Sequence, residues 1–239
     1  MSEESAPLRV GIAGIAGRLG RVAAAAVREA EGIELTGGVV SERTELDEVG
    51  YVRSLDELLA RGEIDVLLDV ATHPGSERWT RAAVGRGIPI VSGSSGWEER
   101  TLDEIGELAK KERVPALFVP NFAIGAVVMI RIAAEIARTF PRAEIIEMHH
   151  DTKRDAPSGT AKVTAKKMEA AGAEHVAIHS VRLPGLVAHQ EIVFGSRGEM
   201  LTLRHDSLSR ESFSDGILAA LRGVHRLPPG LHVGLDLVL

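Results

Sequence analysis

Residues 147–160 contain most of the side chains in this sequence that suit acid–base chemistry. His149 and His150 are adjacent, and Lys153 follows shortly after them. Two imidazoles and an ammonium placed together can bind a carboxylate and deliver a proton to it or to a neighbouring atom. The stretch therefore predicts a site for an acidic small molecule with a proton donor beside it.

The same stretch ends where a helix is expected to begin. Ser158, Gly159 and Thr160 stand at that start, where backbone N–H groups lack intrahelical partners and the two hydroxyls add to an anion site. Two other interpretations stay open. Paired histidines at a strand end can bind a metal, although no third ligand follows at suitable spacing. A charged loop can also simply be solvated.

A glycine-rich segment near the N-terminus is the second chemical feature. Gly14, Gly17 and Gly20 form a G-x-x-G-x-x-G loop between the first apolar run and the first helical stretch. Glycines there let backbone N–H groups approach a pyrophosphate at a helix N-terminus, as in dinucleotide-binding folds. Arg18 and Arg21 offer further positive charge. The alternative is a strand-to-helix turn that binds nothing.

The end of the second expected strand bears on the choice of cofactor. A dinucleotide site normally has Asp or Glu there to hold the ribose 2′-hydroxyl. Here Glu42 stands a residue or two late, and Ser41 and Arg43 suit a 2′-phosphate instead. The pattern is compatible with NADH and NADPH, and leans slightly towards NADPH or dual use.

The remaining pattern shows how these segments are positioned. Up to about residue 120, apolar runs alternate with amphipathic stretches, which predicts a Rossmann-like, doubly wound parallel sheet. Ser54 is expected to cap a short helix. The runs that read as strands cover residues 9–13, 33–40, 65–70, 89–92 and 116–119.

The order changes after Asn121. A long helix over residues 124–139, a strand over 143–149 and a helix from about 160 are followed by three strands in succession, at 176–182, 192–194 and 200–205. This predicts a second α+β domain with a mixed sheet. We expect a dinucleotide-binding domain over residues 1–121, completed by the last helix within 210–239, and a substrate-binding and oligomerisation domain over 122–209.

Composition excludes several classes of protein. The chain has 239 residues, 44% hydrophobic and 26% charged, as in globular proteins. A net charge of −6 with only two Trp, one Tyr and five Phe argues against nucleic-acid binding. The absence of cysteine excludes disulfides, thiolate catalysis and iron–sulfur clusters. With no membrane-length apolar run and no signal peptide, we expect a cytoplasmic protein.

The residues from Glu147 to Ala161 closely resemble the E-x-H-H-x-x-K-x-D-A-P-S-G-T-A signature of the 4-hydroxy-tetrahydrodipicolinate reductases, also called dihydrodipicolinate reductases, of lysine and diaminopimelate biosynthesis. The resemblance extends along nearly the whole chain. Further similar segments are residues 14–21, 93–96, 119–125 and 182–185, together with His189, Glu199 and the segment 209–213.

The resemblance implies a role for each matching residue. His149 would be the general acid/base and Lys153 a second proton donor, and both would act on a cyclic imine with two carboxylates. The substrate would be bound by His150, Lys153, Ser158, Gly159 and Thr160. The dinucleotide would be lined by Gly14, Ile15, Ala16, Gly17, Arg18, Leu19, Ala71, Gly93, Ser94, Ser95, Pro120, Asn121, Phe122 and Ala123.

The resemblance also implies an NADH- or NADPH-dependent oxidoreductase that assembles as a homotetramer and holds no metal. Three departures bear on cofactor preference. Ala16 replaces a frequent glycine, the second-strand acid is absent, and two serines replace two threonines at Ser94 and Ser95. The alternatives are another two-domain nicotinamide oxidoreductase acting on a small carboxylate and a non-catalytic dinucleotide sensor.

Overall fold

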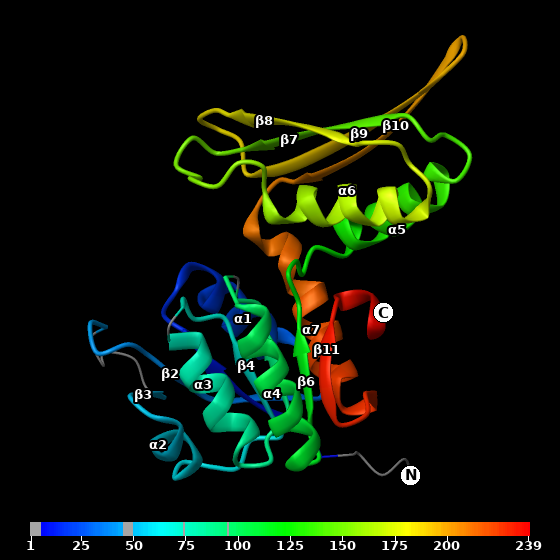
Figure 1. Ribbon diagram of the computed structural model, residues 1–239. Helices are drawn as coiled ribbons and strands as arrows, with labels where there is room; N and C mark the ends of the chain where they lie inside the picture. The colour runs from blue at the N-terminus through cyan, green and yellow to red at the C-terminus, as the bar shows by residue number, and fades with distance from the viewer. Residues whose placement is uncertain (1–5, 45–49, 74, 95) are drawn as a thin grey trace, which may run out of the picture. The chain divides into compact units, whose positions relative to one another are not determined.

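The structure, a computed structural model, describes residues 6–44, 50–73, 75–94 and 96–239. The chain divides into two units (Figure 1). Unit 1 comprises Met1–Phe122 and Phe213–Leu239, and unit 2 comprises Ala123–Ser212. The last α-helix therefore completes the unit that the N-terminal segment begins.

Unit 1 is built on a seven-stranded sheet in the order β11-β6-β5-β4-β1-β2-β3, and every pairing in it is parallel. The predicted doubly wound parallel sheet is confirmed. The strands are β1 (Leu8–Ala13), β2 (Ile33–Val39), β3 (Tyr51–Val52), β4 (Val66–Asp69), β5 (Ile90–Ser92), β6 (Pro115–Phe118) and β11 (Gly230–Val233).

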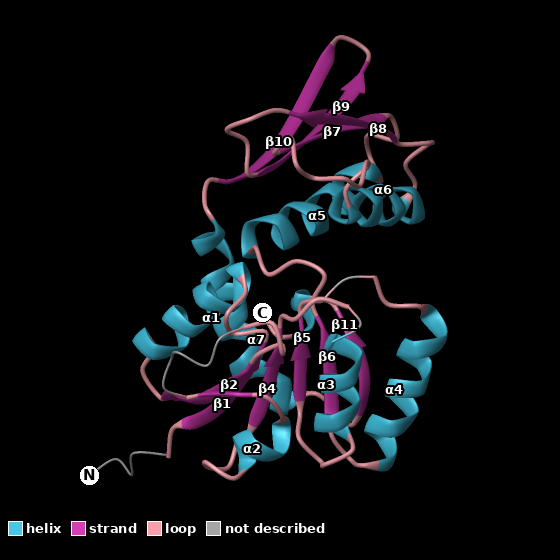
Figure 2. Ribbon diagram, turned by 90° about the vertical axis from the view of Figure 1, so that its left-hand side faces the viewer, coloured by secondary structure: helices cyan, strands magenta, loops and turns pink. Residues whose placement is uncertain are grey.

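Helices cover both faces of this sheet (Figure 2). One core cluster joins α2, α3 and α4 to the sheet, whereas α1 packs beside α7. Ser54 caps α2 as predicted, because its side chain accepts the N–H of Glu57. The helices are α1 (Arg18–Glu29), α2 (Leu55–Leu59), α3 (Gly75–Val84), α4 (Glu99–Lys111) and α7 (Ser214–Gly223).

Unit 2 contains a four-stranded sheet in the order β10-β9-β7-β8. β7 (Ala143–His149) pairs parallel with β8 (Ala177–Arg182) and antiparallel with β9 (Ala188–Ser196), which pairs antiparallel with β10 (Glu199–Ser207). The predicted mixed sheet is confirmed. Helices α5 (Ile124–Ala137) and α6 (Gly159–Ala171) bury Met129, Ala133 and Met168 against Ile145 and Phe194 of the sheet.

Several elements differ from the prediction. β9 begins at Ala188 rather than at residue 192. Gln190 is buried on the core side of this strand in spite of its polarity, so the apolar pattern did not mark where the strand begins. β3 and β11 were not predicted, since such short segments carry little periodicity. The last helix is divided into a 3₁₀ turn, Arg210–Phe213, and α7. No helix in the described ranges is long and apolar enough to cross a membrane.

Candidate active site

The carboxyl ends of the central strands of unit 1 lie in register along one edge of the sheet. Ala13 pairs with Val39 and Asp69, Asp69 pairs with Ser92, and Ser92 pairs with Phe118. Ligands of open parallel sheets bind outside this edge. The predicted cofactor residues that follow these strand ends are Gly14, Ile15, Ala16, Gly17, Arg18, Leu19, Ser41, Arg43, Ala71, Gly93, Ser94, Pro120, Asn121 and Phe122. Ala123 belongs to unit 2, and Ser95 lies outside the described residues.

The first loop at this edge has little room for side chains. Gly14 has φ of +82°, and a Cβ there would lie 2.8 Å from backbone atoms of Ala71. A Cβ at Gly20 would lie 2.1 Å from the carbonyl oxygen of Gly14. Gly17 precedes α1 with no side-chain cap, so the first N–H groups of that helix meet no capping side chain. The backbone here has the geometry that anion-binding loops use. The side chain of Ile15 is buried next to Gly38.

A buried carboxylate connects two of the other loops. Asp69 accepts hydrogen bonds from the N–H of Ala71 at 3.1 Å, from the hydroxyl of Ser92 at 2.8 Å and from the hydroxyl of Ser76. Burial raises the pKa of Asp69, although the hydrogen bonds from Ser76 and Ser92 act to lower it. Asp69 therefore fixes the loop after β4 to the end of β5.

The end of β2 is joined to the end of β3. Val40 donates its N–H to Val52 at 3.0 Å, and the guanidinium of Arg53 donates to the carbonyl oxygen of Ser41. Arg43 is exposed in the turn that follows. Sequence reasoning missed Arg53, because only the pairing of β3 with β2 brings it to this position.

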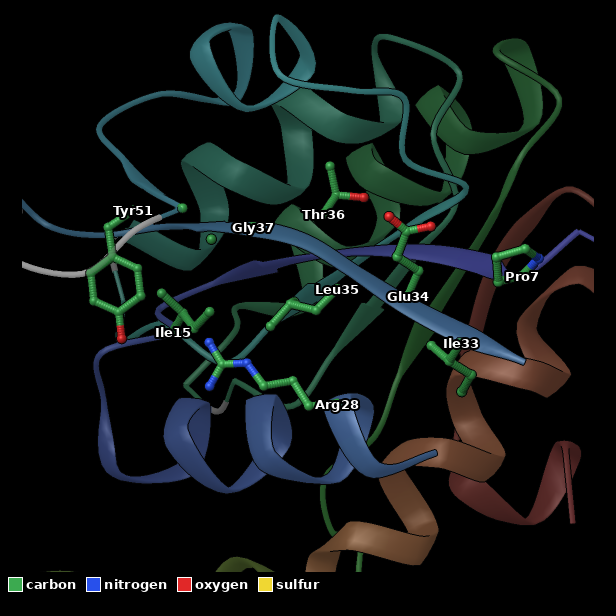
Figure 3. Close-up of a pocket in the computed structure, with 11 residues that line it drawn as sticks. Pro7, Ile15, Arg28, Ile33, Glu34, Leu35, Thr36, Gly37 and Tyr51 are labelled. Carbon is green, nitrogen blue, oxygen red and sulfur yellow. The ribbon is translucent and has the colours of Figure 1, made fainter. Parts of the chain in front are cut away.

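A cavity of about 570 Å³ lies in unit 1 between α1 and β2 (Figure 3). Arg28 of α1 and Leu35 of β2 point towards each other across it, with Ile15 beside them. It lies along the length of β2 rather than at the glycine loop, and its lining includes Gly50, next to residues outside the described part of the chain.

In unit 2, the candidate catalytic residue His149 contacts a fully buried carboxylate, Glu147. This side chain lies 2.6 Å from Nδ1 of His149, and it accepts two N–H groups of Arg182 at 2.7 and 2.9 Å and the backbone N–H of Ser158 at 3.2 Å. Burial raises the pKa of Glu147, but hydrogen bonds from Arg182, Ser180 and His149 outweigh burial and lower it to about 2. Glu147 is therefore ionised at neutral pH.

His149 ends β7 and its side chain is 15% exposed. Burial lowers the pKa of His149, and the charges of Lys153 and Arg182 lower it further, whereas Glu147 raises it. Among the described residues, Nε2 of His149 has no hydrogen-bond partner. The imidazole is thus oriented from one side and available on the other.

The remaining predicted substrate residues lie on the loop and at the helix start next to His149. Lys153 is paired with Asp155 at 2.8 Å, and Nδ1 of His150 lies 2.7 Å from the hydroxyl of Thr152. Ser158 caps α6, with its hydroxyl accepting the N–H of Ala161 at 3.2 Å. Gly159 and Thr160 form the first turn of α6, and a Cβ at Gly159 would meet nothing within 4 Å.

Sequence reasoning missed Glu147 and Arg182 as parts of this site. A signal for Glu147 was present, because residues two apart on a strand share a face and Glu147 is two before His149. Arg182 comes from β8, whose parallel pairing with β7 places it opposite His149. Within the described ranges no three His, Asp or Glu side chains are grouped so as to hold a metal ion.

Comparison with known proteins identifies the family. The family model for the dihydrodipicolinate reductase N-terminus matches residues 8–122, and the model for its C-terminus matches residues 125–239. The chain belongs to the dihydrodipicolinate reductase family. The 4-hydroxy-tetrahydrodipicolinate reductase of Moorella thermoacetica is 38% identical, with 98% of each chain covered. That of Streptococcus gordonii is 41% identical over 91% of this chain and 94% of its own.

A solved member of the family has the same fold. The dipicolinate-bound dihydrodipicolinate reductase from Paenisporosarcina sp. TG-14 matches with a TM-score of 0.87 and 33% identity, covering 98% of this chain and all (100%) of that one. An amine dehydrogenase from Mycobacterium smegmatis matches with a TM-score of 0.72 at 13% identity, which shows a shared fold alone.

Proposed function

We propose that the protein reduces 4-hydroxy-tetrahydrodipicolinate to tetrahydrodipicolinate with loss of water, using NADH or NADPH, in lysine and diaminopimelate biosynthesis. Family membership supports the reaction. The observation that carries the assignment to residues is the imidazole of His149, oriented by a buried carboxylate. Lys153 and the start of α6 follow it on the same loop.

The substrate is a cyclic imine with two carboxylates, and unit 2 has suitable binders for it. Lys153, His150 and the N–H groups at the start of α6 offer positive charge and donors to a carboxylate. On binding, a substrate carboxylate would compete with Asp155 for Lys153. Pyridine-2,6-dicarboxylate, which is bound in the Paenisporosarcina structure, has the same pair of carboxylates.

Loss of the 4-hydroxyl as water leaves a conjugated ene-imine, and a hydride then adds at C4. The nicotinamide supplies that hydride when the dinucleotide is bound. Negative charge develops across the conjugated system as the C4–H bond forms. His149 would quench it by donating a proton, and the ammonium of Lys153 would stabilise the charge electrostatically.

The carboxyl edge of the unit 1 sheet suits the dinucleotide. The backbone around Gly14 and Gly17 leaves the N-terminus of α1 open to a pyrophosphate, and a Cβ at Gly14 would meet the neighbouring loop. The loops that begin at Ala71 and Gly93 would line the rest of the site.

Both nicotinamide cofactors are expected to bind. Ser41, Arg43 and Arg53 can bind a 2′-phosphate, and Arg53 is held in place through the carbonyl oxygen of Ser41. Arg43→Ala should therefore weaken NADPH binding more than NADH binding. A strong preference of the parent protein for NADH would contradict this assignment.

Unit 1 would be the dinucleotide-binding domain, and unit 2 the substrate-binding and oligomerisation domain of a homotetramer. Helices α5 and α6 pack on one face of the unit 2 sheet. The side chains of Ile146, Val181 and Val193 lie on its other face and are half-buried. Light scattering should give four times the chain mass of 25.5 kDa, and a monomer would refute the assembly.

The test of the reaction is cofactor oxidation with substrate generated in place from pyruvate and aspartate semialdehyde. Turnover that requires this substrate would establish the reductase. Dinucleotide binding without any turnover would favour a sensor on the same fold, and turnover of another small carboxylate only would favour a different oxidoreductase.

A further inference from the structure

We propose that Glu147 and Arg182 are positioning residues for catalysis: Glu147 holds the proton of His149 on Nδ1, which leaves Nε2 as the nitrogen that exchanges a proton with the substrate. This inference rests on the proposed function, in which His149 is the proton donor. Neither residue needs to touch the substrate for this role.

The contacts of Glu147 allow only one donor arrangement. Its carboxylate has no exposed surface and accepts from Arg182 through both terminal nitrogens, at 2.7 and 2.9 Å. An arginine guanidinium donates only and stays charged. The ionised carboxylate paired with Arg182 can therefore only accept hydrogen bonds from its other neighbours. In the 2.6 Å contact with His149, Nδ1 must be the donor, so the imidazole proton is on Nδ1.

The tautomer follows from this contact. With Nδ1 as the donor to Glu147, neutral His149 has an unprotonated Nε2, and the imidazolium carries its transferable proton there. A carboxylate behind an imidazole also stabilises the imidazolium that forms when the ring takes up a proton. Nε2 has no partner among the described residues, which leaves it accessible to a ligand.

The same network holds the other groups of the site. The second oxygen of Glu147 accepts the N–H of Ser158 at 3.2 Å, immediately before α6. Arg182 also donates to the carbonyl oxygen of Asp155 at 2.7 Å, and Asp155 pairs with Lys153 at 2.8 Å. One buried ion pair thus fixes the imidazole, the lysine loop and the helix start relative to one another. Such support determines how well a catalytic group is oriented.

The Glu147–Arg182 ion pair in the interior of unit 2 needs a reason other than stability. Burying two charges gains little stability compared with an apolar pair, because desolvation offsets their attraction. Neither Glu147 nor Arg182 transfers a proton to the substrate in this arrangement. The geometry points to orientation of His149 and Lys153 as the use of this pair.

The first experiment uses the parent protein and needs no folded Glu147 variant. Nitrogen-15 NMR of histidine-labelled protein distinguishes the two neutral tautomers, and comparison with His149→Ala identifies the His149 signals. We expect a protonated Nδ1 and an unprotonated Nε2 in the neutral ring. A proton on Nε2 of neutral His149 would overturn the proposal.

The second experiment compares Glu147→Gln with Glu144→Gln. Glu144 lies on the same strand and contacts His179 at 2.7 Å, but its side chain is 63% exposed and away from the site. Glu147→Gln should lower kcat by ~10²-fold or more. A glutamine amide has only one accepting oxygen, so its N–H group faces either Nδ1 of His149 or Arg182, and the contact that orients the imidazole is weakened. Glu144→Gln should keep parent activity. Far-UV circular dichroism and urea unfolding, which report on both units, serve as the folding control for both variants.

The pH profile provides a readout that a purely structural role would not move. The charged groups near His149 are Glu147 on its own strand, Lys153 on the following loop and Arg182 on β8. Loss of the Glu147 charge removes the interaction that raises the pKa of His149. Turnover in Glu147→Gln should therefore begin to decline at a lower pH than in the parent. Unchanged kcat, pH profile and tautomer in the folded variant would refute the inference.

These outcomes separate the two proposals. If His149→Ala retains turnover, the assignment of His149 as proton donor fails. If His149→Ala is inactive while Glu147→Gln keeps full turnover, the proton donor stands and the positioning role is refuted. Should Glu147→Gln fail to fold, Arg182→Lys is the alternative variant. It retains the positive charge but removes the paired contact, and it should also lower kcat more than it changes KM.

Discussion

Acidification should destabilise unit 2 through Glu147. The pKa of this carboxyl is about 2 in the folded protein, whereas its ordinary value is 4.5. Because the folded-state value is lowered, the stabilisation is fully present above pH 4.5 and is lost as the pH falls towards 2. A shift of one pKa unit corresponds to about 1.4 kcal/mol. Full protonation of Glu147 therefore lowers the free energy of unfolding by ~3 kcal/mol, and ~2 kcal/mol of this is already lost at pH 3.

Urea unfolding at pH 7, 4 and 3 would measure this loss. The two tryptophans, Trp79 and Trp97, belong to unit 1, so their fluorescence reports on that unit while circular dichroism reports on both. We expect an acid-sensitive transition that is visible by circular dichroism and weak or absent in fluorescence.

The comparison of variants isolates Glu147 from the other carboxylates. Glu147→Gln should be less stable at pH 7, since Arg182 loses its partner, but its stability should fall ~2 kcal/mol less between pH 7 and pH 3. Glu144→Gln should follow the parent curve. If parent and Glu147→Gln lose the same free energy over this interval, the carboxylate is not stabilised in the way its contacts indicate.

Three further outcomes are expected. Gly14→Ala should weaken dinucleotide binding ~10-fold or more, because φ of +82° and a backbone 2.8 Å away leave no room for a Cβ; equal affinity, measured calorimetrically, would refute this. Arg53→Ala should raise the Kd of NADPH ~10-fold, the effect of one lost charge-assisted hydrogen bond, and leave that of NADH nearly unchanged. His149→Ala and Lys153→Ala should each lose ~10²–10⁴ in turnover, whereas Thr160→Ala should mainly raise KM; steady-state kinetics distinguish the two patterns.

The sequence alone determined the elements and much of the chemistry. Alternating apolar and amphipathic stretches predicted the parallel sheet of unit 1, because each period reflects which face of an element is buried. The glycine loop was recognisable because close backbone contacts leave room only for glycine at Gly14 and Gly20. The segment from Glu147 to Ala161 was recognisable from side chains that suit acid–base chemistry and from its resemblance to a family signature. These features depend on residues that are close together in the sequence, so they can be predicted from the sequence alone.

Contacts between distant segments were decided only in the tertiary structure. Arg182 reaches Glu147 because β8 pairs with β7, and Arg53 reaches Ser41 because β3 pairs with β2. A charged residue in a sequence does not state which buried partner it will meet, since that depends on strand order and register. The orientation of His149 therefore follows from packing, whereas its presence beside Lys153 could be read from the chain.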